Sequence, residues 1–285
     1  MVSKMEPTLF KVGFWCVLGI TVLACLAGLF VLIASRQYNK KLDKLEAIVR
    51  NGNPSLSPGP ELPPAVLALA QRLGARDDRA TPFVYFEQEG VMWHAPQSKP
   101  TRFTAQQTAG VDRPAFVWRA IMGPGKVMGV ADSFVDGIGR LEVRILGALT
   151  VAKMENTADM NQGEILRYLA ELPWNPDAIL QNATLVWTVV DERTLMVAGG
   201  ADGARGEITF LLDADGLIES MSAPSRMYAT KGGMIPLPWH GRFWEYERMD
   251  GRLIPKRGEV AWTLAGKEFV YWRGALRNWR RGGQG

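Results

Sequence analysis

The stretch that decides the fold class is AFVWRAIMGPGKVMGVADSFVDGIGRLEVRIL, residues 115–146. β-Branched and aromatic residues predict three strands in it, at Ala115–Ile121, Val127–Val135 and Arg140–Leu146. Between the last two lies Asp136-Gly137, a dipeptide that favours the tight turn of a hairpin. Because the connections are too short for a crossover helix, we expect neighbouring strands to pair antiparallel.

Strand patterns continue on both sides of this stretch, without strand–helix alternation and without an internal repeat. Upstream, Phe83–Phe86 and Val91–Trp93 are two expected strands around a Glu89-Gly90 turn. The sequence therefore predicts an α+β fold built mostly from an antiparallel sheet. Further strands are expected at Thr184–Val190, Thr194–Ala198, Glu207–Leu212, Leu217–Ser222, Gly241–Arg248, Leu253–Pro255, Glu259–Leu264 and Phe269–Arg273.

One or two helices are expected to cover this sheet. The first, Ala65–Leu73, ends before Gly74, a residue typical of helix C-termini. The second begins at Asn161, whose spacing to Glu164 is that of a capping box, and it ends before Pro173. Its polar face carries side chains at positions i, i+3, i+4 and i+7, which are Glu164, Arg167, Tyr168 and Glu171.

An uncharged apolar segment lies near the N-terminus. Residues Phe14–Ala34 read FWCVLGITVLACLAGLFVLIA, and at ~1.5 Å per residue about 21 residues cover a bilayer core of roughly 30 Å. A secretory signal peptide usually has a shorter apolar core that is followed by a small-residue cleavage site, and neither feature is present. The sequence therefore predicts a single transmembrane helix over residues 12–35, retained as an anchor.

Segments of different composition follow this helix. Residues 36–50 alternate charged and apolar side chains, and Tyr38, Leu42, Leu45 and Val49 recur at helical spacing. We expect these residues to form an amphipathic helix at the membrane surface. Proline and glycine then block regular structure and predict a linker. The predicted organisation is a tail over 1–11, the span over 12–35, the amphipathic helix over 36–50, the linker over 51–64 and a β-rich domain over 65–285.

Composition excludes several classes of site. The formal net charge of +4 is too small to indicate a nucleic-acid binder, which concentrates Lys and Arg in a patch. Both cysteines, Cys16 and Cys25, lie in the apolar segment, so the domain offers neither a disulfide nor a thiolate metal site. The two histidines, His94 and His240, are isolated, so we do not expect a histidine-rich metal site. The sequence has no nucleotide-binding or nucleophile motif, and it predicts no cofactor.

Tryptophans form the first group of candidate site residues. Many of them fall in expected strands, and rings on a concave sheet face could line an apolar cavity. An ordinary aromatic core is the simpler alternative. In a binding site we expect aromatic rings around the ligand and two cations for a polar or anionic head. These candidates are Trp118, Tyr168, Trp174, Trp239 and Trp262 with Arg167 and Arg226.

Three carboxylates form the second group. Glu164 and Glu171 on the helix, with Glu259 in an expected strand, could act as acid and base if burial raised the pKa of one of them. A ladder of ion pairs along the helix is the structural alternative. We therefore keep an enzyme as a rival hypothesis and expect binding rather than catalysis. The arginines near the C-terminus are expected to form a solvated basic tail, and these are Arg273, Arg277, Arg280 and Arg281.

Residues Asn161–Leu180, NQGEILRYLAELPWNPDAIL, carry the pattern Gly-Glu-x-x-Arg-Tyr-Leu-x-Glu-x-x-Trp-x-Pro. Together with Phe103–Gln107, Phe116–Ala120 and Gly258–Trp262, this motif resembles an uncharacterised bacterial family, a domain of unknown function, over residues 63–272. The resemblance brings no reaction, ligand or catalytic residue. The strands with their inserted helix are also similar to the half-barrel of lipoprotein-carrier-like domains, which hold acyl chains between a curved sheet and helices.

The anchor and the resemblance lead to the hypothesis of a membrane-anchored domain that binds a lipid or another apolar ligand. One alternative is an acid–base enzyme, and another is a structural or protein-interaction domain that offers Gln162–Trp174 to a partner. The orientation stays open. Five Lys and Arg residues after the span favour a cytoplasmic domain, whereas an N-terminal signal anchor and the resemblance favour export. We expect a single-pass protein of the inner (cell) membrane with an extracytoplasmic domain.

Overall fold

Strands dominate the computed structural model, which describes residues 7–52, 61–78, 81–201, 203–230 and 232–282. The helices are α1 (Pro7–Asn51), α2 (Pro64–Leu73), α3 (Ala158–Ala170) and α4 (Asp177–Gln181), with 3-10 turns η1 (Pro124–Lys126) and η2 (Leu172–Trp174). The strands are β1 (Phe83–Met92), β2 (Thr101–Gly110), β3 (Phe116–Met122), β4 (Met128–Val135), β5 (Ile138–Ile145), β6 (Leu149–Glu155), β7 (Val186–Val189), β8 (Thr194–Ala201), β9 (Ala204–Leu212), β10 (Ile218–Thr230), β11 (Gly233–Met249), β12 (Arg252–Leu264) and β13 (Lys267–Arg281).

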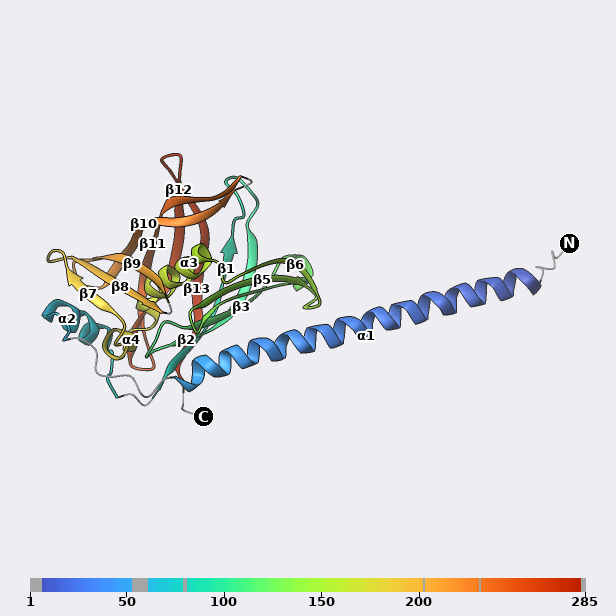
Figure 1. Cartoon of the computed structure of the whole chain (residues 1–285), viewed down its shortest axis with the longest axis horizontal. Helices are drawn as coiled ribbons and strands as arrows, with labels where there is room; N and C mark the ends of the chain where they lie inside the picture. Colours follow the sequence, from blue (N-terminus) through green and yellow to red (C-terminus); the bar gives the residue numbers. More distant parts are fainter. Residues whose placement is uncertain (1–6, 53–60, 79–80, 202, 231, 283–285) are drawn as a thin grey trace.

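These strands form one antiparallel sheet of 13 strands that curls into a half-barrel (Figure 1). Hairpins build the sheet in two directions, from β1 out to β6 and from β13 back to β7. The first strand pairs with the last, with Val84 opposite Arg281 and Met92 opposite Trp272. The predicted α+β class with a mostly antiparallel curved sheet is confirmed.

Helix α3 lies against the concave face of the half-barrel (Figure 1). Its Ile165 and Leu169 are fully buried and face the strands β8 to β10. Gly206 of β9 permits this close approach, because a Cβ at that position would lie 2.9 Å from Cγ2 of Ile165. One side of α3 thus belongs to the core, and its polar side is held inside the curve of the sheet.

Helix α1 runs unbroken from Pro7 to Asn51 and projects away from the sheet (Figure 1). Its N-terminal part is exposed, and it is apolar and long enough to cross a membrane. Its C-terminal part packs on the outer face of β2, β3 and β4, where Tyr38, Leu42 and Val49 are buried. The predicted amphipathic helix therefore turns its apolar stripe toward the sheet, whose Val117 and Ala131 supply apolar partners, and not toward a membrane surface.

Some strand boundaries differ from the expectation. The predicted Glu89-Gly90 turn is wrong, because both residues continue β1, and Gly90 pairs with Phe103 and with Gly274. The strands β2 and β6 lie where no strand was expected. β2 has few large apolar residues, although Phe103 and Ala105 on it are buried. β6 is an exposed edge strand without a hydrophobic pattern.

The second domain helix begins earlier than predicted. Thr157 is its N-cap, with Oγ1 accepting a hydrogen bond from Met160 N at 3.2 Å. Asn161 lies inside the helix, where its side-chain oxygen accepts a hydrogen bond from Gly139 N at 2.8 Å and ties α3 to β5. Residues 53–60 of the predicted linker and residues 1–6 of the predicted tail lie outside the described residues.

Candidate functional site

A cavity of about 510 Å³ lies between α3 and the concave face of the sheet. We call it the inner cavity. Its wall draws residues from α3 and from both halves of the sheet, β1 and β3 to β6 in one half and β10 to β13 in the other. The apolar wall combines aromatic rings with methionines, whose flexible thioethers adapt to irregular shapes. The methionines are Met92, Met154, Met160, Met221, Met227 and Met234.

Trp118, Trp174 and Trp239 present apolar surface to the cavity because their N–H groups already have partners. Trp174 Nε1 donates to the Pro255 carbonyl at 2.8 Å, and its ring meets Phe243 edge-on with centroids 5.4 Å apart. Trp118 Nε1 donates to Gln88 Oε1 at 2.9 Å. A buried indole with a satisfied donor behaves as a large hydrocarbon toward the cavity.

Arg167 of α3 is held by a closed set of partners at one side of the inner cavity. Its Nη1 bonds Asp132 Oδ2 at 2.5 Å, its Nε bonds Glu171 Oε1 at 3.0 Å, and its Nη2 bonds Gln107 Oε1 at 3.1 Å. The guanidinium carbon also lies 4.8 Å from the centre of the Phe116 ring. With every nitrogen engaged, Arg167 ties α3 to β2 and β4 and has little capacity left for a ligand.

Glu164 lies one turn before Arg167 on α3 and lines the same cavity. Its side chain is only 5% exposed, and burial, together with the negative charge of Asp132, raises its pKa to about 8. Its Oε2 and the Oδ1 of Asp132 are both buried without a hydrogen-bond partner among the described residues. At neutral pH the Glu164 carboxyl is therefore protonated, so it can donate a hydrogen bond into the cavity.

Arg226 of β10 is the cation with the loosest contacts in the wall. Its guanidinium carbon lies 4.5 Å from the centre of the Trp239 ring and 5.7 Å from that of Trp262. Its polar contacts are long, 3.4 Å to the Tyr271 hydroxyl and 3.9 Å to Glu164 Oε1. Cation–π contacts thus hold its position, while most of its hydrogen-bonding capacity stays free for a ligand.

Six of the seven predicted ligand-binding residues meet at this cavity, namely Trp118, Arg167, Trp174, Arg226, Trp239 and Trp262. Tyr168 does not. Its side chain is buried on another side of α3, where the hydroxyl donates to the Gly110 carbonyl at 2.9 Å and accepts from Asn182 Nδ2 at 3.0 Å. Desolvation raises the Tyr168 pKa. Tyr168 is thus a structural residue.

The predicted carboxylate group does not share one environment. Glu164 and Glu171 line the inner cavity, whereas Glu259 borders both this cavity and another one that is lined by Arg242, Arg257 and Arg273. There it bonds Arg242 at 2.7 Å and Arg273 at 2.8 Å, each from the neighbouring strand in register. Glu259 is thus already bonded to two arginines, and an acid–base set that includes it stays a prediction.

The C-terminal arginines do not form a solvated tail, because all four lie in strand β13. Arg273 pairs with Glu259, Arg277 with Glu89, and Arg281 with Asp78. The structure also gives no group of three or more metal-ligating side chains within the part of the chain that it describes.

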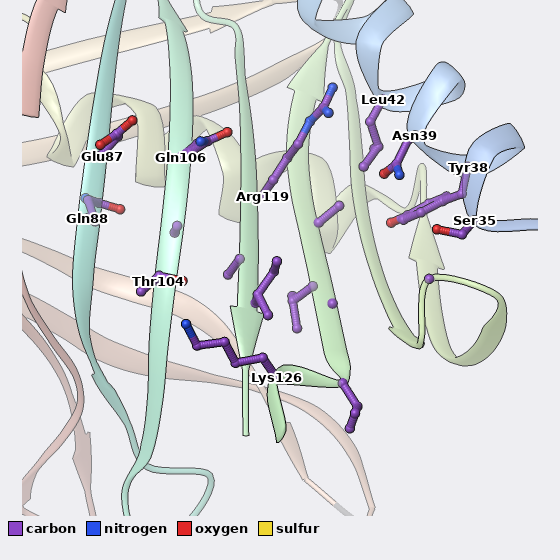
Figure 2. A pocket seen from close by; sticks show the side chains of 18 of the residues that line it. Ser35, Tyr38, Asn39, Leu42, Glu87, Gln88, Thr104, Gln106, Arg119 and Lys126 are labelled. Carbon is purple, nitrogen blue, oxygen red and sulfur yellow. The ribbon is translucent and has the colours of Figure 1, made fainter. Parts of the chain in front are cut away.

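A second cavity, of about 560 Å³, separates α1 from the outer face of β1 to β4 (Figure 2). Figure 2 shows Tyr38 and Leu42 pointing from α1 toward the strands, with Arg119 and Lys126 on the sheet side. Arg119 is engaged by α1 through Asp43 at 2.8 Å. We place the candidate site in the inner cavity, because the aromatic rings and methionines gather there, whereas the principal cation of the outer cavity is already paired with α1.

Comparisons with known proteins place these features in a wider group. A family model described as "Family of unknown function (DUF6920)" matches residues 60–280, as the resemblance of the motif led us to expect. No curated protein matches the sequence.

Distant matches are found among solved structures. A LolA superfamily protein from Nitrosomonas europaea is 10% identical with a TM-score of 0.42, covering 78% of this chain and 94% of that one. A putative outer membrane lipoprotein-sorting protein domain from Vibrio parahaemolyticus is 12% identical with a TM-score of 0.42, covering 76% and 92%. A porin-like protein from Bacteroides uniformis is 10% identical with a TM-score of 0.25, covering 70% and 97%. Similarity this low carries no argument about function.

Proposed function

We propose that this chain, which belongs to the family of unknown function (DUF6920), binds a lipid or another apolar ligand in its inner cavity while α1 holds it on a membrane. The observation that carries the proposal is the wall of the cavity, in which methionines and satisfied indoles surround a volume of about 510 Å³. Small-molecule sites are typically apolar clefts of ~300–1,000 Å³ with a few placed polar groups.

Arg226 is the residue that we assign to the polar head of this ligand. It faces the cavity with long contacts to its protein neighbours, and a carboxylate or phosphate would supply the short charge-assisted bonds that it lacks. Protonated Glu164, 3.9 Å away, could donate a further hydrogen bond to the same head. The guanidinium of Arg167 is already hydrogen-bonded to Asp132, Glu171 and Gln107, so Arg167 would only shape the wall of the cavity.

Helix α1 is the proposed anchor. The most apolar stretch of its N-terminal part has a mean hydropathy of 2.8, and none of this stretch is buried against the domain. We propose a single crossing of the inner membrane with the domain on the extracytoplasmic side. The five Lys and Arg residues that follow the span favour the opposite side, so reporter fusions at the C-terminus are decisive. Activity of a cytoplasm-specific reporter alone would overturn this orientation.

Photo-crosslinking tests the ligand. The full chain in nanodiscs is incubated with a diazirine fatty acid and irradiated, and the labelled peptides are mapped by mass spectrometry. We expect label on α3 and on β10 to β13, and little label on Met221→Trp, which fills the cavity. The matched control is Leu211→Trp on the outer side of β9, which is 40% exposed and should label as wild type. Equal labelling of both variants, or label confined to α1, would contradict the proposal.

An acid–base enzyme remains a second candidate, on the specific observation that Glu164 has a raised pKa beside Glu171 and Asp132 in one cavity. Glu164→Gln keeps the shape and removes the titrating proton. A panel of lipid esters offered to both proteins tests this candidate, and turnover by wild type that Glu164→Gln abolishes would favour it. The protein-interaction alternative loses support, because much of Gln162–Trp174 is buried within the half-barrel.

A further inference from the structure

Two neighbouring hairpins end in a patch of exposed apolar side chains, which we call the hairpin patch. Ile121 and Val127 come from the β3–β4 hairpin, and Leu146, Leu149 and Val151 come from the β5–β6 hairpin. Each is between 40% and 63% exposed. A hydrogen bond of 2.7 Å from Leu146 N to the Val127 carbonyl joins the two hairpins, so their tips lie side by side. An exposed apolar surface of this kind marks an interaction site.

The hairpin patch lies where the apolar run of α1 ends. Gly147, in the turn between β5 and β6, touches Ser35, because a Cβ added to Gly147 would lie 2.6 Å from Ser35 Oγ. Ser35 directly follows Ala34, the last residue of the exposed apolar run. A bilayer that holds this run has its surface at Ser35. The turn, and the hairpin patch with it, therefore lies at the level of the headgroups.

The charges around the hairpin patch suit the same environment. Arg36 and Lys40 are exposed on α1, and Lys126 is exposed at η1 between the two strands of the first hairpin. Cations beside exposed apolar side chains are typical of segments that lie in the interface of anionic bilayers. Because α1 also packs on β2 to β4 through Tyr38 and Val49, the domain cannot swing the hairpins away from this level.

We propose that the hairpin patch inserts into the headgroup region of the bilayer that holds α1, so that the half-barrel is attached to the membrane at two places. The proposal rests on the membrane crossing by α1 and is independent of what the inner cavity binds. A second protein would have to enter between the hairpin tips and the bilayer surface, and for this reason lipid is the occupant that the geometry favours.

Site-specific fluorescence tests this contact in the full chain. Cys16 and Cys25 are changed to Ser, and Leu149→Cys or Val151→Cys is labelled with an environment-sensitive dye. The protein is placed in nanodiscs of phosphatidylcholine and phosphatidylglycerol, with or without lipids that carry a doxyl quencher near the headgroup. The matched control is Val186→Cys. It lies on β7, the edge strand at the opposite end of the sheet, and is 55% exposed against 54% for Val151.

Doxyl lipids should reduce the emission from positions 149 and 151 at least about twofold, because interfacial segments lie ~5–10 Å into the headgroup and acyl boundary. Emission from position 186 should not change, and quenching should weaken when phosphatidylglycerol is omitted. Protein that stays in the membrane during carbonate extraction is anchored by α1. If the dye at positions 149 and 151 of such protein is not quenched, the proposal is overturned and the anchor is not. A blue shift without quenching would indicate a protein contact and would also overturn it. Loss of carbonate resistance would overturn the anchor itself.

Discussion

Two buried clusters of charged residues in this domain differ in whether all their carboxyl oxygens are hydrogen-bonded. At one end of the half-barrel, Asp177 is fully buried and both its oxygens are bonded, by Arg252 at 3.0 and 2.8 Å and by the Arg76 amide at 2.9 Å. In the inner cavity, Glu164 and Asp132 each keep one buried oxygen without a partner among the described residues. We call the first cluster closed, because both carboxylate oxygens of Asp177 are bonded, and the second open, because Glu164 and Asp132 each keep an oxygen that no described residue bonds.

This contrast separates buried charges that stabilise the fold from buried charges that are available for function. A buried ion pair is favourable only while all its groups are bonded. Removing one partner leaves the other charge buried and unpaired, and this destabilises the fold. A buried group that lacks a partner is costly, and it persists beside a cavity where a ligand or solvent can complete its bonding. We therefore expect the closed cluster to control stability and the open one to control binding and its pH dependence.

The largest effect should come from Arg252→Gln. This substitution leaves Asp177 buried beside Arg281 without its bidentate partner, and we expect a loss of about 3–5 kcal/mol in the free energy of unfolding. Denaturant unfolding of the detergent-solubilised full chain measures it. The control is Arg257→Gln, whose pair with Glu245 is half exposed and should contribute less than about 1 kcal/mol. Similar losses for both variants would remove the distinction between closed and exposed pairs.

The next effect concerns pH. Folded Glu164 keeps its proton up to about pH 8, whereas the unfolded carboxyl ionises near 4.5. Between these values the folded state binds more protons, so the free energy of unfolding falls as pH rises and levels off above about 8. At ~1.4 kcal/mol per pH unit, the fall between about pH 6 and 8 is of the order of 3 kcal/mol. Denaturant unfolding of the wild-type protein, measured across this pH range, should show this fall in the free energy of unfolding.

Glu164→Gln should abolish this fall and make the variant more stable than wild type at high pH. Glu207→Gln is the matched control, because Glu207 is exposed on β9 and should leave the wild-type pH dependence unchanged. An identical pH profile for Glu164→Gln and wild type would mean that the carboxyl is ionised in the folded state, and the cavity would then lose its proposed hydrogen-bond donor.

A smaller effect should follow Arg226→Gln. Charge-assisted hydrogen bonds contribute ~1.5–3 kcal/mol, so affinity for a long-chain fatty acid should fall by roughly tenfold or more. Affinity for the corresponding fatty alcohol, which has no charge, should change little. Arg248→Gln serves as the control, because Arg248 is exposed on β11. Equal losses for acid and alcohol would show that Arg226 acts by packing on Trp239 and Trp262 and not by its charge.

The smallest effect should come from Glu259→Gln. Its partners Arg242 and Arg273 are half exposed and can return to water, so we expect less than about 1 kcal/mol in stability and unchanged ligand binding. Ligand-binding titrations and unfolding curves of the same preparation measure both quantities. A loss of binding as large as that of Arg226→Gln would show that Glu259 takes part in ligand binding.

The sequence predicted the class of fold and the tryptophans of the cavity wall because both depend on local patterns. Alternating aromatic residues indicated strands, and the rings Trp118, Trp239 and Trp262 reach one cavity because they share the concave face. The partners of Arg167 could not be predicted, because Gln107 and Asp132 come from strands joined to α3 only by tertiary packing.

Two other features had no usable signal in the sequence. Methionines have no strong preference for strand or helix and follow no periodic pattern here, so their gathering at the cavity depends on the closed sheet. The stripe Tyr38, Leu42 and Val49 has the spacing of any amphipathic helix, and a membrane surface or an apolar sheet face satisfies it equally. Only the tertiary structure selects the sheet.

The unbroken course of α1 limits where this protein can act. No glycine or proline interrupts it between Gly28 and Asn51, so it behaves as a stiff rod. At ~1.5 Å per residue, the 17 residues from Ser35 to Asn51 rise roughly 25 Å. In a bilayer the domain is left with rotation about the membrane normal and a small tilt, and it samples a thin layer next to the lipid. Whatever it exchanges must be delivered to that layer, because a half-barrel on a rigid rod cannot travel to meet a distant partner.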